Sequence, residues 1–385
     1  MSCTATPAAP TTGRPVRIPV EISNNHVLVT VCHGTRSLVF ILDTGAGANI
    51  FDLATARSLG VELGTPMQAG GAGAGAVNGA LLDSGSVRVA GIAGEFPVAL
   101  AIDLRRLQRN KGRPIHGILG HDFIGRFVMA IDYRGHELRL YERSGYKYEG
   151  TGTTIPIVME NGHPIVRAEL GLADGARIPA KVVVDVGSSQ SLMITKPVVD
   201  QNQLRTRVGP TMKFGGGGGV GGTITADIGR IAQLRVGTAT LTDVTASLFG
   251  DSAGVLSTNA LWDANIGGDI LRRFTVYFDH RANTMVLEPH PATNEPFEAD
   301  MSGMRVTADS TLTTLRVTGV NPGSPADEAG VKAGDVVLRI DGRAVSGSAA
   351  DSLRERLRRA GEQVGLSLHR GTSIVEVRVL TRRIV

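Results

Sequence analysis

A repeated pair of segments constrains the fold of this 385-residue chain more than any other feature of its sequence. The first pair matches VFILDTGAGANIF at residues 39–51 with VVVDVGSSQSLMI at residues 182–194. The second pair matches GILGHDFIGRFVMAIDY at residues 117–133 with ANIGGDILRRFTVYFDH at residues 264–280, in the same order and at nearly the same offset. Self-similarity at a fixed offset indicates repeated structural units. We therefore expect two lobes of one design.

Both lobes are predicted to consist mainly of β-strands. Residues 38–42 and 182–184 are continuous apolar runs, as in strands that are buried on both faces. Each run is followed by an aspartate and a glycine-containing turn. Short helices are expected over residues 52–58 and 196–203. With 50 glycines, 17 prolines and only 4% aromatic residues, the composition also indicates short strands and tight turns, and hence a mainly β protein.

Asp43 and Asp185 form the candidate catalytic pair. Each stands at the end of a buried strand, where a glycine turn would place its carboxylate on the floor of a cleft between the lobes. Two carboxylates at hydrogen-bond distance share a proton, so one accepts a proton from water while the other donates to a substrate carbonyl. This chemistry hydrolyses a peptide bond with neither a metal nor a covalent intermediate. The alternative is that both aspartates only satisfy turn amides.

The sequence around these aspartates resembles that of bacterial retropepsin-like aspartic peptidases. Asp43-Thr44-Gly45-Ala46 is similar to the Asp-Thr-Gly-Ala signature of that family, and Ile118-Leu119-Gly120 is similar to its hydrophobic-hydrophobic-Gly element. In the second lobe, Asp185-Val186-Gly187-Ser188 and Ile266-Gly267 resemble the same two elements. The resemblance covers residues 15–290 and implies two pseudo-symmetric acid-protease β-barrel lobes.

The resemblance further implies an aspartic endopeptidase that acts on extended polypeptides without a cofactor, with a dyad that can form within a monomer. The residues implied to support the dyad are Thr44, Gly45, Ala46, Gly120, Val186, Gly187, Ser188 and Gly267. Glycine-rich stretches at residues 70–80 and 215–222 are typical of mobile hairpins and would be the flaps, with Gly71, Gly73, Gly75, Gly216, Gly217 and Gly218 as candidates. Neither stretch contains a tyrosine, which favours the retropepsin comparison over pepsin-like enzymes.

Two residues depart from the family pattern. Val186 stands where the family has threonine or serine, whose hydroxyls form reciprocal hydrogen bonds between the lobes, so only Thr44 can take part here. One lost net hydrogen bond costs about 0.5–1.5 kcal/mol, or about 1–3 kcal/mol if the partner is buried unsatisfied. Asn265 is polar where the family is apolar, a departure of small weight. Two alternatives therefore stay open, a non-catalytic peptide-binding pseudopeptidase and an envelope scaffold.

The C-terminal segment resembles a bacterial PDZ domain, a small α+β fold. Ser324-Pro325 is predicted to start a short helix that ends at Gly330, Asp341-Gly342 to form a tight hairpin, and residues 350–360 to form an amphipathic helix. The resemblance implies that a C-terminal or internal peptide adds as a strand beside that helix. The implied peptide-binding residues are Ser302, Gly303, Met304, Arg305 and Val306. The alternative is a PDZ fold that only braces the lobes.

These observations divide the chain into a flexible N-terminal tether at residues 1–14, lobes at residues 15–145 and 150–290, and a PDZ domain at residues 300–385. Cys3, next to the loose Thr/Ala/Pro tract, resembles the lipid-acceptor cysteine of a mature bacterial lipoprotein, and the alternative is an ordinary flexible terminus with an unpaired thiol. By analogy with PDZ-bearing bacterial peptidases, we expect a periplasmic protein of the cell envelope rather than a cytoplasmic one, with a lipid anchor at Cys3 if the first of these interpretations holds.

Charge and cysteine content exclude several partners. The net charge of +4 is weak for a nucleic-acid binder, and no apolar run is long enough for a transmembrane segment. With only two cysteines, we expect no disulfide framework and no metal site. The basic residues between 105 and 113 are interpreted as a solvated loop. The arginines at 354, 356, 358 and 359 are interpreted as a solvated helix face.

Overall fold

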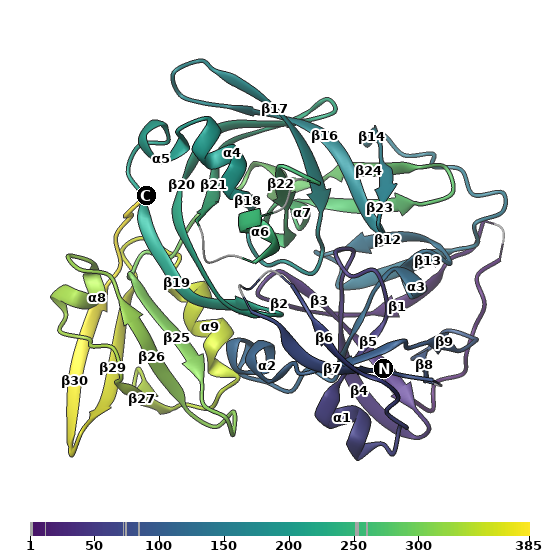
Figure 1. Cartoon of the computed structure of the whole chain (residues 1–385). Helices are drawn as coiled ribbons and strands as arrows, with labels where there is room; N and C mark the ends of the chain where they lie inside the picture. Colours follow the sequence, from purple (N-terminus) through teal and green to yellow (C-terminus); the bar gives the residue numbers. More distant parts are fainter. Residues whose placement is uncertain are drawn as a thin grey trace.

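The computed structural model describes residues 3–11, 13–71, 73, 75–83, 85–250, 254–258 and 261–385. Over these residues the chain forms four β-sheets with short helices around them (Figure 1). The sheets have six, ten, eight and six strands. The prediction of a mainly β protein with two barrel-like lobes and a small α+β C-terminal domain is confirmed.

The first lobe is built on the ten-stranded sheet. In spatial order its strands are β6 (Pro66–Ala69), β7 (Val77–Leu81), β10 (Leu100–Ile102), β5 (Ile50–Asp52), β11 (Gly117–Leu119), β4 (Arg36–Leu42), β3 (His26–His33), β8 (Ser86–Val89) and β9 (Phe96–Pro97), with β2 (Glu21–Ser23) paired to β3. Its helices are α1 (Leu53–Ser58), α2 (Arg105–Lys111) and α3 (His121–Ile124). Asp52 caps α1 by accepting a hydrogen bond from the N–H of Thr55, so this helix begins where the sequence predicts it.

The second lobe repeats this plan in an eight-stranded sheet. Its strands are β15 (Val158–Glu160), β16 (His163–Gly171), β17 (Arg177–Val184), β22 (Ala264–Ile266), β18 (Leu192–Ile194), β21 (Ala239–Phe249), β20 (Gly222–Val236) and β19 (Met212–Gly219). An additional pairing of β16 with β20 curls the sheet toward a barrel. The helices are α4 (Lys196–Gln201), α5 (Leu204–Arg207), α6 (Val255–Thr258) and α7 (Gly268–Leu271).

A six-stranded sheet joins the lobes. Its order is β1 (Val16–Pro19), β13 (Glu137–Tyr141), β12 (Val128–Asp132), β23 (Phe274–Asp279), β24 (Thr284–Pro289) and β14 (Thr153–Pro156), so β12 and β23 meet at its centre (Figure 1). One continuous core of buried aliphatic and aromatic side chains runs through both lobes. Because the sheet and the core are shared, the repeated halves are held in a fixed relation to one another.

The C-terminal domain follows a 3-10 turn, η1 (Pro291–Asn294), and has its own core. Its strands are β25 (Met304–Ala308), β26 (Leu315–Val320), β27 (Val336–Ile340), β29 (Gln363–Arg370) and β30 (Ser373–Leu380), with β28 (Arg343–Ala344) paired to β27, and its helices are α8 (Pro325–Glu328) and α9 (Ala349–Arg356). Ser324 caps α8, as predicted. The final helix ends at Arg356, earlier than predicted, although Leu353 and Leu357 are both buried.

The basic stretch at residues 105–113 is not a solvated loop. It forms α2, which packs against β25, α9 and β19 and so joins the first lobe to the C-terminal domain (Figure 1). Arg109 donates from Nε to the carbonyl of Ala308 at 3.1 Å, and Lys111 is buried. Gly112, at a φ of 65°, closes the helix in contact with Gly347. The contact between the domains explains why Lys111 is buried, while Arg105, Arg106 and Arg109 stay exposed.

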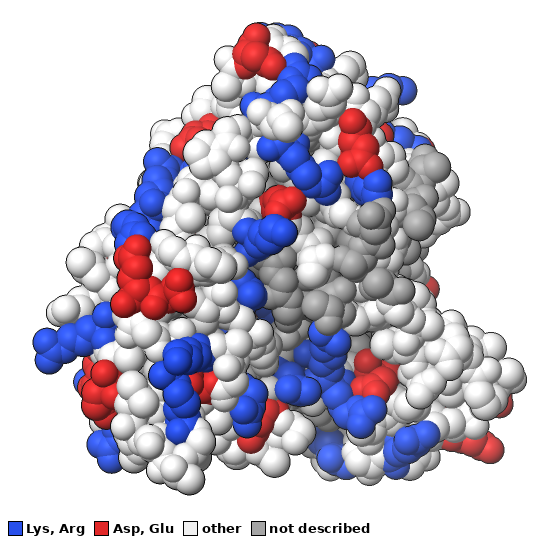
Figure 2. All heavy atoms as spheres, turned by 60° about the vertical axis from the view of Figure 1, so that its left-hand side comes forward, with Lys and Arg blue, Asp and Glu red and all other residues white. Residues whose placement is uncertain are grey.

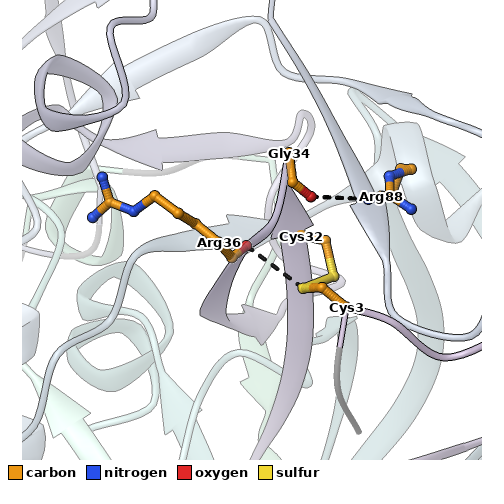
Figure 3. Close-up of a disulfide and its surroundings, with 5 residues drawn as sticks. All are labelled: Cys3, Cys32, Gly34, Arg36 and Arg88. Atoms are coloured by element: carbon orange, nitrogen blue, oxygen red, sulfur yellow. Dashed lines mark hydrogen bonds between the residues drawn. A yellow bond between two sulfur atoms is a disulfide. The ribbon is translucent and has the colours of Figure 1, made fainter.

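The N-terminal segment differs from the predicted flexible tether. Cys3 forms a disulfide with Cys32 on β3, and Ala8 makes a parallel bridge with Ile92 (Figure 3). The two cysteines thus form a single bond with each other, a pairing that the sequence did not predict. The Cys3 sulfur, being bonded to Cys32, is not available as a lipid acceptor in this form. Cys3 and Cys32 are 29 residues apart in the sequence, and this spacing alone does not predict that the N-terminal segment packs against β3.

The surface carries charges of both signs. Figure 2 shows basic and acidic side chains interspersed over one face of the molecule rather than gathered into one basic stripe. Among the described residues, no helix has the length and apolar character needed to cross a membrane.

Candidate active site

Each candidate aspartate is fixed by the strand arrangement at the end of a buried strand. In the first lobe, β11 lies between β4, to which it is parallel, and β5, to which it is antiparallel. Asp43 follows β4 and donates its N–H to the carbonyl of Leu119 at 2.9 Å. In the second lobe, β22 lies between β17 and β18 in the same way, and Asp185 donates its N–H to the carbonyl of Ile266 at 2.8 Å.

The two aspartates meet between the lobes. The N–H of Gly45 donates to Asp43 Oδ1 at 2.7 Å. Gly45 has to be small, because a β-carbon there would lie 2.9 Å from Asp185 Oδ1 and 3.0 Å from Asp43 Oδ1, so the two carboxyl groups face each other across this glycine. At Gly187 a β-carbon would lie closer still, 2.4 Å from both oxygens of Asp43. The glycine after each aspartate thus allows the opposite carboxylate to approach.

The remaining supporting residues shape the two turns. Gly120 packs against the backbone of the first turn, where a β-carbon would lie 2.3 Å from the carbonyl oxygen of Ala48, and it donates its N–H to Asn49 Oδ1 at 2.9 Å. Gly267 donates its N–H to the carbonyl of Ser191 at 2.8 Å. Ala46 and Ser188 each donate their N–H to the carbonyl of their lobe's aspartate at 3.3 Å. The hydrophobic-hydrophobic-Gly elements therefore close the turns as the sequence predicts.

The hydroxyl of Thr44 makes both of its hydrogen bonds across the lobe boundary. It donates to the carbonyl of Val184 at 2.6 Å and accepts the N–H of Val186 at 2.9 Å. Val186 itself is fully buried in the shared core and offers no hydroxyl in return. The connection between the catalytic turns is therefore one-sided, and the second lobe's turn is held through its backbone.

Asn265 contacts the dyad directly, so its departure from the family pattern matters more than the sequence suggested. It lies on β22 beside the dyad, is buried, and its side-chain amide donates to Asp185 Oδ2 at 3.4 Å. The matching residue in the first lobe is Ile118, on β11, which has no donor to offer Asp43. The pseudo-symmetry of the site is thus broken at a second point.

Burial raises the pKa of both carboxyl groups. For Asp43 the pKa lies well above its ordinary value, first because of burial and then because of the neighbouring Asp185. Burial also raises the pKa of Asp185, and its interactions with Asn265 and Asp43 offset part of that increase. Both carboxyl groups thus have a raised pKa, and only Asp185 has a neighbouring side-chain amide that favours its ionised form.

The dyad lies in a cavity of about 630 Å³ covered by both glycine-rich hairpins. The first hairpin joins β6 to β7 and the second joins β19 to β20. Their tips meet: Gly73 donates its N–H to the carbonyl of Val220 at 2.9 Å, and Gly75 donates to Gly221 at 2.5 Å. Gly71 lines the cavity, whereas Gly217 and Gly218 pair with Ile224 and Thr223 of β20, after a bulge that lies between Gly215 and Gly217 and includes Gly216.

Two polar side chains that the sequence did not single out also line this cavity. His163 and Trp262 lie with their ring centroids 5.2 Å apart. The Nδ1 atom of His163 and the Nε1 atom of Trp262 are buried and have no hydrogen-bond partner among the described residues. Unpaired buried donors at a cleft wall are available to the backbone of a substrate. No sequence motif surrounds either residue, so only the fold could identify them.

A buried Lys–His pair lies between α2 and the second catalytic turn. Lys111 Nζ lies 2.7 Å from His26 Nδ1, and the neighbouring Asn25 donates its side-chain amide to the carbonyl of Ser189 at 2.8 Å, just after that turn. Burial lowers the pKa of Lys111 to about 7, although Asp351 of the C-terminal domain acts in the opposite direction. The second catalytic turn is thus supported by residues at the boundary with the C-terminal domain.

The predicted peptide-binding residues of the C-terminal domain face the same cavity. Gly303, Met304, Arg305 and Val306 line it together with the dyad. Ser302 and Gly303 donate their N–H groups to Asp300 Oδ1 at 3.0 and 2.6 Å, so these loop amides are paired within the chain. No group of three or more histidine, cysteine, aspartate or glutamate side chains arranged to hold a metal was found within the described part of the chain.

Two facing lobes that each contribute an aspartate to one flap-covered cavity define the class of two-lobed aspartic proteases. Comparison with known families agrees: the aspartyl protease family matches residues 27–123 and 169–261, and a PDZ domain family matches residues 316–370. The lobes therefore belong to the aspartyl protease family, and the chain ends in a PDZ domain, as the sequence predicts. None of the curated proteins matches this chain.

Proposed function

We propose that this protein is an aspartic endopeptidase that hydrolyses extended polypeptides, with Asp43 and Asp185 as its catalytic residues. The observation that carries the proposal is the facing pair of carboxyl groups, one from each lobe, in a cavity large enough for several residues of a peptide. Both aspartates come from one chain, so a monomer contains the whole dyad.

The asymmetry around the dyad supports a separate role for each carboxyl group. In the proposed mechanism, Asp43 carries the shared proton and donates it to the carbonyl oxygen of the scissile peptide bond. Asp185 receives the proton of the attacking water, and its Oδ1 atom is buried without a hydrogen-bond partner in the described structure. Asn265 supports this assignment because its amide stabilises the ionised form of Asp185.

The reaction then balances in two steps. The water oxygen bonds to the carbonyl carbon while Asp185 takes its proton and Asp43 protonates the carbonyl oxygen, which gives a neutral gem-diol. The C–N bond then breaks, the nitrogen takes the proton from Asp185, and one hydroxyl of the diol returns a proton to Asp43. The products are a carboxylic acid and an amine, and the dyad returns to its initial state.

The PDZ domain supports recognition of a peptide near the cleft. Its strand β25 and the loop before it form part of the cavity that contains the dyad, instead of facing away from it. A polypeptide in the cavity would therefore contact both the protease lobes and the PDZ domain. This arrangement favours peptide recognition over a PDZ fold that only braces the lobes.

The second candidate function is a peptide-binding pseudopeptidase. The one-sided connection through Thr44 favours it, because Val186 leaves the second turn without its own hydroxyl. The buried location of Val186 argues for a dyad that is nevertheless well supported, since this turn packs into the shared core. Catalysis and peptide binding without turnover are distinguished by measuring cleavage.

We also propose that the protein works in an oxidising compartment such as the cell envelope. Disulfides persist mainly outside the reducing cytosol, and the Cys3–Cys32 bond supports this location. Mass spectrometry of the unreduced native protein should find a Cys3–Cys32 peptide. A lipid attached to Cys3 would contradict the disulfide.

The experiment for the proposed activity is cleavage of an unstructured protein between about pH 4 and 8. We expect Asp43→Asn and Asp185→Asn each to lower the rate at least about 100-fold, because proton transfer contributes that much. The matched control is Asp132→Asn, which removes a strand-end carboxylate that does not line the cavity with the dyad. Absence of cleavage by the wild type, with binding of peptides retained, would support the pseudopeptidase instead.

A further inference from the structure

The PDZ domain presents its carboxylate-binding loop in an occupied form. The side chain of Asp300 accepts the N–H groups of Ser302 and Gly303 and the hydroxyl of Ser302, all through Oδ1. The N–H of Met304 donates to the Ser302 hydroxyl at 3.0 Å. Each amide of this loop thus has a partner within the chain. A carboxylate from a peptide would have to displace Asp300 in order to bind there.

The edge of β25, where a peptide strand would add, is also partly occupied. The carbonyl of Val306 accepts a hydrogen bond from Arg354 Nη2 at 3.0 Å. The carbonyl of Ala308 accepts from Arg109 Nε of the first lobe at 3.1 Å. The α2 helix contacts both β25 and α9, the two elements between which the peptide would lie. The usual peptide-binding groove of the PDZ domain is therefore partly occupied. The face of the PDZ domain that lines the catalytic cavity is the other place where a peptide can contact it.

On that face Arg358 differs from the other arginines near α9. Arg354 pairs with Asp351 at 2.9 Å, Arg356 with Glu362 at 2.9 Å, and Arg359 with Glu355 at 2.7 Å. The side chain of Arg358, just after α9, lines the catalytic cavity and has no hydrogen bond or ion pair within the described structure. The prediction of a solvated basic face is therefore wrong for Arg358, which lies in the cavity wall.

The acidic residues nearest to Arg358 are already paired. Asp269 accepts the Ser191 hydroxyl at 2.6 Å and forms an ion pair with Arg272 at 3.1 Å. Asp300 is held by the loop amides. Two further cations on the same side of the cavity, Lys111 and Arg354, add positive charge. The guanidinium of Arg358 acts on Asp269 and Asp300 through space, but within the described structure it forms no ion pair with either of them. Because it lines the cavity, it can pair with a carboxylate of a ligand there.

We propose that Arg358 forms a carboxylate-binding subsite, by which the PDZ domain selects polypeptides for the protease cleft. The ligand is a carboxylate of the substrate, either an acidic side chain or the C-terminal carboxylate. Because Arg358 and the dyad line one cavity, that carboxylate binds at a fixed number of residues from the scissile bond. A charge-assisted pair of this kind contributes about tenfold or more in affinity. The proposal deepens and rests on the proposed endopeptidase function.

The first test compares matched peptide substrates on the full-length protein. One pair has Glu or Gln at each scanned position, and a second pair has a free or an amidated C-terminus. We expect the wild type to cleave the carboxylate form at one position, or at the terminus, with about tenfold higher kcat/KM. Arg358→Gln should abolish the preference, and Arg358→Glu should reverse it toward a Lys-containing peptide. Arg359→Gln, which alters an exposed pair outside the cavity, should keep it.

A second readout separates this inference from the proposed activity. Binding of the same fluorescent peptides to Asp43→Asn protein is measured with and without Arg358→Gln, so no cleavage is needed. Loss of carboxylate preference in the Arg358→Gln protein supports the subsite even if the wild type cleaves nothing. Cleavage by the wild type with equal kcat/KM for both forms, or a preference that survives Arg358→Gln, overturns the subsite and leaves the protease function standing.

Discussion

The two catalytic turns share a design but are held in different ways. In the first lobe, the Thr44 hydroxyl makes two hydrogen bonds across the lobe boundary. Because the residue beside Asp43 is Ile118, this carboxyl group has no side-chain amide next to it that matches Asn265. In the second lobe, Val186 packs in the core and Asn265 donates to Asp185. The first lobe therefore supplies the connection between the turns, and the second lobe supplies the polar support for one carboxylate.

This division explains how one substitution in the repeat is tolerated. A buried valine needs no hydrogen-bond partner, so the second turn has no unsatisfied hydroxyl and gains apolar contacts instead. Duplicated lobes also allow the two aspartates to differ, because a residue beside one carboxyl group is not repeated beside the other. The asymmetry thus gives each carboxyl group different surroundings, as the proposed division of the proton transfers requires.

The largest expected difference between the lobes concerns the Thr44 hydroxyl. Thr44→Val would leave the N–H of Val186 and the carbonyl of Val184 buried without this partner, so we expect a loss of about 2–4 kcal/mol in the free energy of unfolding. Val186→Thr should change it by less than about 1 kcal/mol, because no existing bond is removed. Urea unfolding of both variants measures the difference. Equal losses would show that the two turns are equivalent.

The disulfide is the next largest difference, since only the first lobe has one. It closes a loop between residues separated by 29 positions, for which we expect a stabilisation of about 2–3 kcal/mol. Cys32→Ala or a reductant should therefore lower the melting temperature, most strongly for the unfolding of the first lobe. Hydrogen exchange resolves the lobes separately. Unchanged protection of β3 after reduction would contradict this expectation.

The dyad should also make stability depend on pH. The pKa of Asp43 is raised in the folded protein, so its contribution to stability is complete below the ordinary pKa of 3.8 and is lost as the pH rises through the folded-state pKa. Each such proton changes stability by at most about 1.4 kcal/mol per pH unit. Asp43→Asn cannot ionise and should flatten the profile above pH 4. A thermal-melting series from pH 3 to 8 tests this, and identical profiles would contradict the raised pKa.

The smallest expected effect comes from Asn265. Asn265→Ile gives the second lobe the residue type of the first and removes the donor to Asp185, which raises the pKa of that carboxyl group. We expect the acid limb of the kcat/KM profile to move to higher pH and the rate below the optimum to fall about 2- to 10-fold. Asn265→Asp, which keeps the shape but adds charge, should have a larger effect. An unmoved acid limb would show that Asn265 only fills space.

Local sequence predicted the parts of the fold that repeat. The aspartates, their glycines and the Gly120 and Gly267 elements are contiguous motifs, so their geometry follows from short segments. The sequence also identified Val186 as the weak point of the connection between lobes. The structure adds that the Thr44 hydroxyl forms both of its hydrogen bonds with backbone groups of the second lobe. Every residue type has these backbone groups, so the sequence of the second turn could not reveal the bonds.

Features that depend on distant contacts were missed. Arginines and lysines in α2 are solvated in most proteins, and only the contact with the PDZ domain buries Lys111. Asn265 is one position on a three-residue strand, whose side chain could face either way until the register with β17 is known. Cys3 lies beside Cys32 of β3, and Arg358 lines the cavity with the dyad, although in both cases the neighbouring residues are distant in the sequence.

The central claim is that the dyad forms from both lobes of one chain, and mixing inactive variants tests it most directly. Asp43→Asn and Asp185→Asn proteins are prepared separately, incubated together through a cycle of unfolding and refolding, and assayed for cleavage of an unstructured protein. We predict that each variant and the mixture are inactive, because every chain then lacks one carboxylate of its own dyad. Recovery of about a quarter or more of the wild-type rate on mixing, or wild-type activity in either variant alone, would contradict the account.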